Sequence, residues 1–226
     1  MEKLITKEDK LSVSIDIKQA LENESKVYLF LKRAIDLVGS IFGIVLLSPI
    51  FLIISILIKI EDPKGSIFFV QKRNGKYGKV FKMYKFRSMV HNAEELLESL
   101  QEQNEQTGPV FKIKDDPRVT KIGRIIRKTS LDELPQLFNI LKGDMSLVGP
   151  RPPLPQEVKQ YTPYQMQRLL VKPGLTCIWQ TSGRNTIAFD EWVEMDLEYI
   201  RKRNLRLDIK LIFKTVRVLF GDDNAS

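Results

Sequence analysis

The feature that most constrains this chain is an apolar run of about 22 residues, Leu37 to Ile58, that contains no charged side chain. About 20 consecutive apolar residues suffice for a helix to cross the hydrocarbon core of a bilayer, so the run predicts a membrane helix. Ser48 and Pro49 fall near its middle. A proline there removes one helix hydrogen bond, and the neighbouring serine hydroxyl can satisfy part of the freed backbone. We therefore expect a helix that is bent or broken at Ser48-Pro49.

Two observations bear on whether this helix crosses the membrane. Each half of the run is roughly 15 to 18 Å long at about 1.5 Å per residue, near half the thickness of the hydrocarbon core. Basic residues flank both ends, Lys32 and Arg33 before the run and Lys59 and Lys64 after it, whereas a spanning helix normally has one basic side. A re-entrant helix that leaves by the face it entered satisfies both observations. A kinked single span is the alternative, and the residues by themselves leave both open.

The composition of the whole chain is typical of a basic, globular protein. The 226 residues carry 36 Lys and Arg against 28 Asp and Glu, a net charge of +8, and 43% are apolar, which is enough for one sizeable core. The segment from Lys64 to Arg87 is basic throughout and contains no acid. One cysteine, Cys177, and one histidine, His91, exclude a disulfide framework and a zinc site of the Cys/His type within this chain.

The chain divides into three segments. Residues 1–25 are polar, with no apolar run long enough for a signal peptide, and predict a mobile or weakly helical tail. Residues 26–62 hold the membrane segment, and residues 63–226 the remainder. The pattern from Ser66 to Met89 predicts one or two short strands joined by a turn that contains glycine. The residues expected to face inward from these strands are Phe68, Val70, Val80 and Met83.

Helices are expected to dominate the remainder, so the predicted fold class is mainly α with a small β element, that is, α+β. Val119 to Lys128 has apolar residues at helical spacing and a cationic opposite face. Further helices are predicted at 157–171, 189–203 and 205–220. The last one is amphipathic and basic, so it either covers a soluble core or lies in a membrane interface, and the apolar run favours the interface.

Two adjacent carboxylates, Asp132 and Glu133, are the candidates for chemistry. No P-loop, Rossmann fingerprint, Ser-His-Asp set or Cys-His pair can be assembled from the sequence. A structural role is one interpretation, since Ser130 and Glu133 spell a capping box and acidic residues favour the first turn of a helix. Pro135 would then interrupt that helix, whereas a start at Asp132 places the proline in the first turn, where it is tolerated.

A functional role is the other interpretation. Arg124 and Arg127 lie just upstream of the carboxylates, and Arg151 lies in a stiff turn, Val148 to Pro153. These cations would keep a carboxylate ionised and attract anionic phosphates. Paired carboxylates without histidine suit Mg²⁺, which accepts one or two carboxylates together with substrate phosphates and water. An aspartate can also act as a nucleophile and form an acyl phosphate.

An ordered series of motifs runs along about residues 28 to 220. The stretches are Lys32–Asp36, Ser48-Pro49, Tyr84–Met89, Lys112–Arg124, Ser130–Gln136, Lys142–Pro152, Lys172–Thr176 and Gly183–Asn185. This series resembles the bacterial sugar transferases, the monotopic polyprenyl-phosphate glycosyl-1-phosphate transferases, in their minimal catalytic-domain form. Cys177 departs from the pattern, because members of the family usually have glycine at that point.

The resemblance implies a monotopic membrane protein. A cytoplasmic catalytic domain, residues 63–226, would be held on the inner membrane of a bacterium by a re-entrant helix broken at Ser48-Pro49, with amphipathic helices in the interface. The implied reaction moves a sugar-1-phosphate from a UDP-sugar to a polyprenyl phosphate such as undecaprenyl phosphate and releases UMP. That would be the first membrane step in making an exopolysaccharide, capsule, O-antigen or glycoprotein glycan. Membrane lipids are further partners, nucleic acid is not, and a homodimer is left open.

The resemblance also assigns roles to residues. Asp132 is expected to be the nucleophile that attacks the sugar-bearing phosphorus, with the phosphosugar then passing from Asp132 to the polyprenyl phosphate. Glu133 is expected to assist with Mg²⁺ or with the acceptor's proton, and both carboxylates are candidate metal ligands. The candidate phosphate-binding residues are Arg127, Arg151, Lys85 and Arg124, and the candidate nucleotide-sugar-binding residues are Arg184 and Asn185.

A second hypothesis comes from a different class of protein. A membrane-anchored module could bind anionic lipid or nucleic acid through the basic segment Lys64 to Arg87. It predicts salt-sensitive binding that is indifferent to Asp132, and no turnover. Nucleic acid is disfavoured because the segment has no recognisable nucleic-acid-binding motif and lies beside the apolar run.

Overall fold

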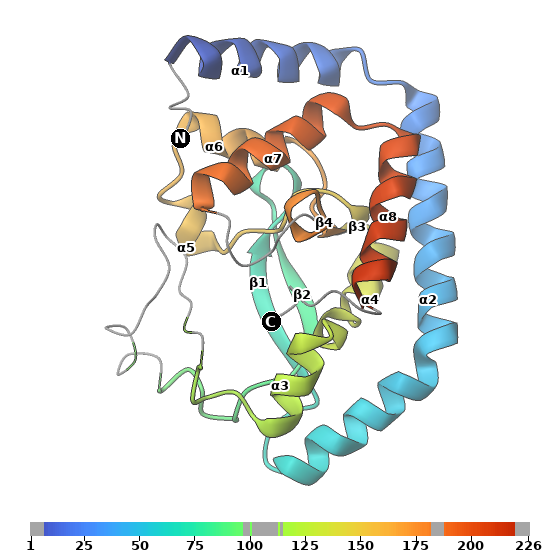
Figure 1. Ribbon diagram of the computed structural model, residues 1–226, viewed down its shortest axis with the longest axis vertical. Helices are drawn as coiled ribbons and strands as arrows, with labels where there is room; N and C mark the ends of the chain where they lie inside the picture. The colour runs from blue at the N-terminus through green and yellow to red at the C-terminus, as the bar shows by residue number, and fades with distance from the viewer. Residues whose placement is uncertain (1–6, 97–99, 101–112, 114, 182–187, 220–226) are drawn as a thin grey trace.

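The computed structural model describes residues 7–96, 100, 113, 115–181 and 188–219. Helices surround a small central pair of strands, and one long helix runs along the side of the molecule (Figure 1). The helices are α1 Lys7–Glu22, α2 Lys26–Glu61, α3 Lys121–Lys128, α4 Gln136–Lys142, α5 Pro155–Val158, α6 Pro163–Met166, α7 Phe189–Lys202 and α8 Leu205–Leu219. The strands are β1 Phe68–Asn74, β2 Val80–Phe86, β3 Ser146–Val148 and β4 Gly174–Thr176. The prediction of a mainly α protein with a small β element is confirmed.

Helix α2 contains the whole apolar run and is bent (Figure 1). Pro49 lies inside it and cannot donate to the carbonyl of Val45, and the Ser48 hydroxyl donates to that carbonyl instead, at 2.8 Å. The helix therefore continues through the pair, and the bend is attributed to the proline. Among the described residues, α2 is the one helix long and apolar enough to cross a membrane by length and composition. Its outer side chains are exposed, Val38 and Val45 by 68% each.

Both ends of α2 are tied to the same body of protein. Near its start, Arg33 donates to the backbone carbonyl of Ile140 in α4 at 2.7 Å. At its end, the Glu61 carboxylate accepts from the backbone N–H of Lys121 in α3 at 2.7 Å. Residues that precede and follow the apolar run are therefore held by neighbouring helices of one fold.

Strands β1 and β2 form an antiparallel hairpin, as the sequence predicts. Met83 is buried, with 2% exposed, as expected, but Phe68, Val70 and Val80 are 42%, 46% and 50% exposed. The prediction that these three face inward is wrong. Side chains alternate along a strand, so Val80 and Met83 cannot share a face, and the covered face is the one that carries Met83.

The largest core cluster forms around α7, from buried residues that include Leu197, Tyr199 and Ile200. Helix α1 joins this cluster through Ile17, which is fully buried. Where the sequence suggests a mobile or weakly helical tail, the structure has a helix over Lys7–Glu22 that packs on α7. Local polarity conceals this helix, because its contact with the core is made by few side chains, with Ile17 buried and Val13 and Leu21 partly buried.

Helical periodicity predicts the helices correctly where no proline or cap interrupts them. Helices α3, α7 and α8 agree with the predicted helices within a few residues. The helix expected over 157–171 is instead divided into α5, α6 and a 3₁₀ turn at Gln167–Leu170. Pro163 starts α6 after Thr162, whose hydroxyl accepts from the backbone N–H of Gln165, and this cap begins a new helix.

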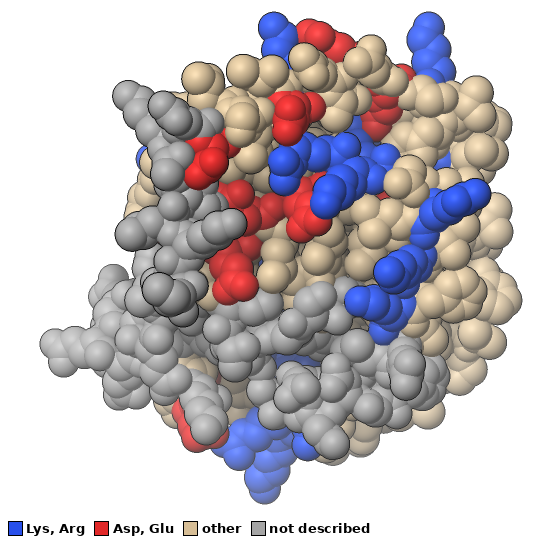
Figure 2. Space-filling view, turned by 45° about the horizontal axis from the view of Figure 1, so that its top comes forward, with Lys and Arg blue, Asp and Glu red and all other residues tan. Residues whose placement is uncertain are grey.

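Charged and apolar surfaces are both present. Figure 2 shows lysine, arginine, aspartate and glutamate side chains gathered on the face turned to the viewer. Helix α8 packs through Leu211, which is buried, and exposes Ile209, Phe213 and Val216 by 39%, 71% and 46%. These three recur at helical spacing and face away from the protein core, whereas Ile212 of the same predicted stripe packs against the core cluster.

Candidate active site

Asp132 and Glu133 lie in a 3₁₀ turn between α3 and α4, at Leu131–Glu133. Ser130 before the turn has a φ of 55° and makes no side-chain cap bond, and Pro135 immediately precedes α4. The capping-box interpretation is therefore wrong, and so is a helix start at Asp132. A left-handed serine on one side and a proline on the other confine this segment to a tight turn.

Two leucines anchor the turn. Leu131 and Leu134, three residues apart, pack in a cluster with Ile54 and Ile58 of α2. The carboxylates lie between these anchors, and Asp132 is 8% exposed. The end of the apolar helix and the carboxylate pair therefore share one packing unit.

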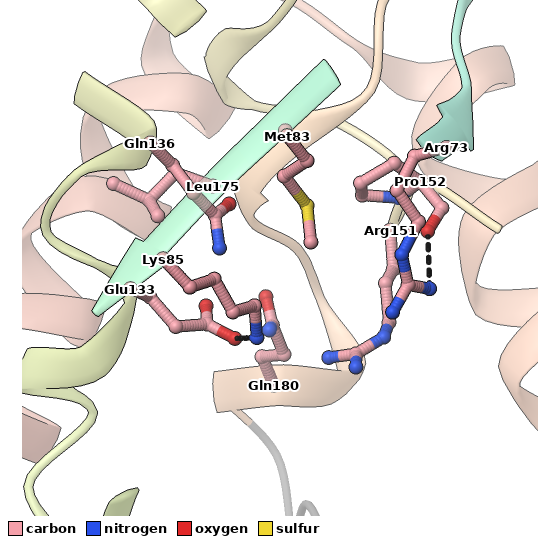
Figure 3. A pocket seen from close by; sticks show the side chains of 10 residues that line it. Arg73, Met83, Lys85, Glu133, Gln136, Arg151, Pro152, Leu175 and Gln180 are labelled. Atoms are coloured by element: carbon pink, nitrogen blue, oxygen red, sulfur yellow. Dashed lines mark hydrogen bonds and ion pairs between the residues drawn. The ribbon is translucent and has the colours of Figure 1, made fainter. Parts of the chain in front are cut away.

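Lys85 of β2 is the counter-ion of the pair. Its Nζ lies 2.6 Å from Glu133 Oε1 and 3.8 Å from Asp132 Oδ2, and Figure 3 shows the contact with Glu133. The family resemblance implies that Lys85 binds phosphate. The structure places it between two carboxylates, where it neutralises like charges that would otherwise repel.

The charge state of Asp132 depends on its neighbours. Burial raises the pKa of Asp132, Lys85 opposes this increase, and Glu133 adds to it. Arg127 and Arg151 also lower the pKa of Asp132. A carboxylate that is costly to ionise is thus kept near cations that favour the charged form.

A pocket opens beside Glu133, and its lining includes Arg73, Lys85, Gln136, Arg151 and Gln180. Figure 3 shows Glu133 and Lys85 on one side of it, with Arg73 and Arg151 on the other. An anionic group that entered the pocket would meet two guanidinium groups close to the carboxylate pair.

Arg151 is held by a loop with demanding geometry. β3 pairs in parallel with β4, and Gly174 N–H donates to the carbonyl of Pro150 at 2.9 Å. A side chain at Gly149 would collide with the backbone carbonyl of Lys172. The guanidinium of Arg151 lies 5.9 Å from the centre of the Trp179 ring, within the range of a cation–π contact.

Arg73 is a pocket residue that the sequence analysis does not single out. Its guanidinium donates to the carbonyl of Pro152 at 3.1 Å, next to Arg151 in the chain. Burial and the neighbouring Arg151 lower the pKa of Arg73 to about 10, so it remains charged at neutral pH. The antiparallel register pairs Gln71 with Met83, which places Arg73 on the same face as Lys85. That register is the signal that could have identified it.

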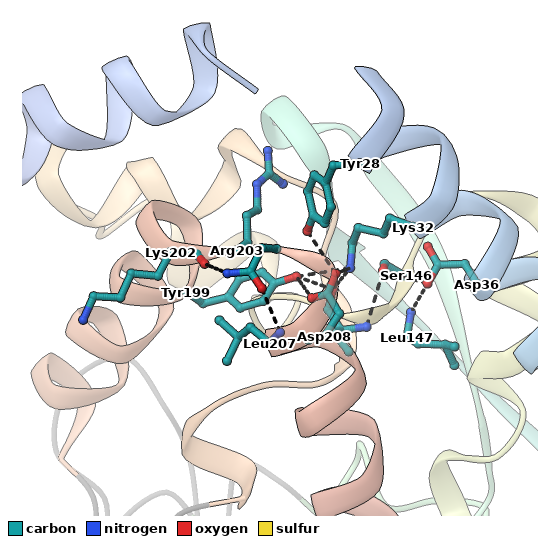
Figure 4. A network of polar contacts seen from close by, with 12 residues as sticks. Tyr28, Lys32, Asp36, Ser146, Leu147, Tyr199, Lys202, Arg203, Leu207 and Asp208 are labelled. Atoms are coloured by element: carbon teal, nitrogen blue, oxygen red, sulfur yellow. Dashed lines mark hydrogen bonds and ion pairs between the residues drawn. The ribbon is translucent and has the colours of Figure 1, made fainter. Parts of the chain in front are cut away.

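Helix α2 also supports the arginine loop through a buried polar network (Figure 4). Lys32 Nζ donates to Asp208 Oδ2 and to the carbonyl of Val148, both at 3.0 Å. The hydroxyl of Tyr199 donates to Asp208 Oδ1 at 2.7 Å. Asp36 Oδ1 accepts from the backbone N–H of Leu147 in β3 at 2.9 Å. The first turns of α2 therefore fix the strand that leads into Arg151.

The other predicted residues have different outcomes. Arg127, in the last turn of α3, is close enough to Asp132 to affect its pKa. Arg124 lies one turn earlier on an exposed part of α3 and is not among the groups that most affect the pKa of Asp132. Arg184 and Asn185 lie outside the described residues.

The donor chemistry of the site fits a magnesium ion. Asp132 and Glu133 are hard oxygen ligands that converge on one lysine, and Mg²⁺ needs only one or two carboxylates when phosphates and water complete its shell. In the described part of the chain, no group of three or more His, Cys, Asp or Glu side chains gathers around a metal site. A divalent cation would therefore use these two carboxylates and depend on a phosphate substrate for further ligands.

The fold and the site define a protein with one long, exposed apolar helix and an acidic pair beside a cationic pocket, and comparison with known proteins gives its family. The model of the bacterial sugar transferase family matches residues 27–222. Galactosyl transferase CpsE of Streptococcus agalactiae serotype III (strain NEM316) is 47% identical over 195 residues, which cover 85% of this chain and 42% of that protein. The chain belongs to the bacterial sugar transferase family.

Two further relatives show how the chain aligns with longer and shorter members. Undecaprenyl-phosphate galactose phosphotransferase of Salmonella typhimurium (strain LT2) is 46% identical over 200 residues, 87% of this chain and 42% of that protein. Exopolysaccharide production protein ExoY of Sinorhizobium fredii is 41% identical over 189 residues, 82% of this chain and 83% of that protein. The chain thus spans less than half the length of CpsE and of the Salmonella protein.

Proposed function

We propose that this protein transfers a sugar-1-phosphate from a UDP-sugar to undecaprenyl phosphate or a similar polyprenyl phosphate, releasing UMP, as the first membrane step of exopolysaccharide or related glycan synthesis. The observation that carries the proposal is the buried Asp132, adjacent to Glu133 and Lys85 and near Arg127 and Arg151. The names of the relatives, which include galactose and N-acetylgalactosamine phosphotransferases acting on undecaprenyl phosphate, support it.

In the first step, an oxygen of the Asp132 carboxylate attacks the sugar-bearing phosphorus. A phosphorus–oxygen bond forms to Asp132, the bond to the bridging oxygen breaks, and UMP leaves with that oxygen. In the second step, a phosphate oxygen of the polyprenyl phosphate attacks the same phosphorus and displaces the carboxylate. The product is a polyprenyl-diphosphate sugar, and Asp132 is regenerated.

The surrounding residues supply positioning and charge, which dominate phosphoryl transfer. Arg151 and Arg127 would bind phosphate oxygens, with Arg73 holding the Arg151 loop. Lys85 keeps the carboxylates close together at low electrostatic cost. Glu133 would assist the acceptor's proton or the metal. A Mg²⁺ ion held by Asp132 and Glu133 would supply neutralisation of developing phosphate charge.

The proposed membrane placement is based on α2. We propose that α2 is re-entrant and holds a catalytic domain, residues 63–226, on the cytoplasmic face of the inner membrane, with α8 in the interface. The contacts of Arg33 and Glu61 with one body of protein support this topology, since a straight span would carry them to opposite sides. A bent helix with polar ends and an exposed apolar middle fits a bilayer entered and left by one face.

Turnover is tested with purified protein, Mg²⁺, undecaprenyl phosphate and a panel of UDP-sugars that starts with UDP-galactose and UDP-N-acetylgalactosamine. UMP should appear only when the lipid phosphate is present. Asp132→Asn should abolish release, and the wild-type protein should form an alkali-labile adduct with a radiolabelled sugar phosphate. Full turnover by the Asp132→Asn variant would exclude Asp132 as the nucleophile. If no UDP-sugar in the panel releases UMP, the result would favour the binding-module hypothesis.

Topology is tested separately in intact cells. Single cysteines are introduced near Lys26 and Lys64, on either side of the apolar helix, and labelled with a membrane-impermeant reagent. The re-entrant model predicts that neither site reacts in intact cells and that both react once the inner membrane is permeabilised and the reagent reaches the cytoplasm. Labelling of the two sites from opposite faces would show a single span.

A further inference from the structure

The β1–β2 hairpin has two faces that differ in chemistry. One face lines the pocket through Arg73, Met83 and Lys85. The opposite face is turned away from the site, and most of its side chains are exposed. We call this the outer face, and it consists of Phe68, Val70 and Lys72 of β1 with Val80, Lys82 and Tyr84 of β2.

The polarity of the outer face changes from the start of the hairpin to the lysine rung, beyond which the last rung pairs buried Asn74 with exposed Val80. The register pairs Phe68 with Phe86, then Val70 with Tyr84, then Lys72 with Lys82. From the phenylalanine rung to the lysine rung the strand rises about 13 Å, at about 3.3 Å per residue. Directly opposed lysines are unfavourable in an isolated sheet. The face therefore has an aromatic end and a cationic rung towards the other end, where Lys72 and Lys82 repel each other.

The neighbouring helix α4 shows the same change from an aromatic side chain to a lysine along its length. Phe138 is 39% exposed at its start and Lys142 is exposed one turn later. The Lys142 amine lies 2.6 Å from the hydroxyl of Tyr84, so the cationic ends of α4 and the hairpin lie side by side. The aromatic ends also adjoin, because the rings of Phe138 and Phe86 contact Phe51 of α2, with centroids 6.1 and 5.2 Å away. The gradient thus starts at the apolar helix and points away from it.

Within the described residues, no acidic side chain forms an ion pair with the lysines of the outer face and of the hairpin tip. The ion pairs formed within the described part of the chain include none of Lys72, Lys76, Lys79 and Lys82. These lysines remain available to an anionic partner.

We propose that the outer face of the hairpin, together with Lys142, lies against the bilayer and binds the headgroups of anionic phospholipids. The proposal rests on the membrane placement of α2 given above. The aromatic end would lie at the boundary of the acyl chains, where aromatic side chains gather, and the lysines would reach the headgroup level. A second copy of this chain is a less favourable partner for the outer face, because a two-fold contact would bring the same lysines of both copies together.

A lipid-proximity experiment tests the inference on the full chain in nanodiscs. A fluorescent label is placed on Lys79→Cys at the hairpin tip and, as a control, on Lys18→Cys of α1, whose side chain is 78% exposed. The native Cys177 is buried and does not compete for the label. Quenching by a lipid with a nitroxide headgroup is compared in discs of phosphatidylcholine with and without phosphatidylglycerol.

We expect quenching at position 79 to exceed that at position 18 by about twofold or more in discs with phosphatidylglycerol, and to fall as salt is raised. Lys72→Gln with Lys82→Gln should remove the dependence on phosphatidylglycerol, whereas Lys18→Gln with Lys202→Gln should not. Equal quenching at both positions, quenching that ignores phosphatidylglycerol, or crosslinking between two copies through position 79 would each overturn the proposal.

The readout needs no turnover, so it is independent of the chemistry at Asp132. A third label at Val45→Cys, on the exposed middle of α2, reports the membrane placement by itself with an acyl-chain quencher. If Val45 is quenched and position 79 is not, the outer-face proposal fails and the membrane placement survives. If neither is quenched, both fail.

Discussion

Lys85 and Glu133 lie 48 positions apart in the chain and form an ion pair of 2.6 Å at the entrance to the pocket. The lysine comes from the inner face of the hairpin and the glutamate from the turn after α3. Because the same Nζ lies 3.8 Å from Asp132, the placement of the hairpin controls the charge of the proposed nucleophile.

Loss of this lysine should move the pH dependence of transfer. An ionised Asp132 is needed for attack, so activity falls as pH drops through its pKa, which burial already raises. Lys85→Met removes the strongest opposing group, so the acid limb of the pH–rate profile should move to higher pH by about one unit or more. Lys82→Met, on the outer face of the same strand, is the matched control. An unchanged acid limb in Lys85→Met would contradict this role.

Asp132→Asn should separate activity from stability. Its pKa is higher in the folded protein than in the unfolded chain, so the carboxyl stabilises the fold below its unfolded pKa and this contribution is lost as pH rises through the folded pKa. The amide removes a buried carboxyl that is costly to ionise. We expect turnover to fall by about 1,000-fold or more, with Tm in detergent unchanged or raised by about 2 to 4 °C. Asp190→Asn, on the surface of α7, should change neither quantity, and a clear drop in the Tm of Asp132→Asn would show a structural role.

The two arginines of α3 should differ in function. Arg127 is among the groups that most affect the pKa of Asp132, and Arg124, one turn earlier, is not. We expect Arg127→Gln to lower kcat/KM for the UDP-sugar by about 10-fold or more, and Arg124→Gln by less than about threefold. Equal losses would mean that the whole cationic face of α3 contacts substrate.

The buried pair of Lys32 and Asp208 should matter for stability. Their side chains are 11% and 4% exposed, and the lysine also holds the carbonyl of Val148. Lys32→Met leaves a buried carboxylate without its cation, and we expect a loss of about 3 kcal/mol in the free energy of unfolding, measured by denaturant titration in micelles. Lys202→Met breaks an exposed pair with Glu198 and should cost less than about 0.5 kcal/mol. Similar losses for both variants would contradict the importance of burial.

Local sequence determined the parts of this protein that depend on neighbours in the chain. The apolar run and Pro49 give a long, bent helix whatever surrounds it, because proline cannot donate and the run has no charge. The helices α3, α7 and α8 follow from apolar spacing alone. The ordered series of motifs along about residues 28 to 220 pointed to the family, and comparison confirmed it.

Tertiary structure decided everything that depends on distant partners. Which face of the hairpin is covered was settled by the helices that pack on it, since both faces carry phenylalanine, Phe68 on one and Phe69 and Phe81 on the other. The helix at Lys7–Glu22 is held by Ile17 in a cluster built mainly by residues beyond 140. Lys85 became a counter-ion, and Arg73 a pocket residue, because strand register and a loop 79 positions away bring their partners to them. Periodicity reports only which side of an element is apolar, whereas charges and hydrogen bonds between distant segments exist only once the chain has folded.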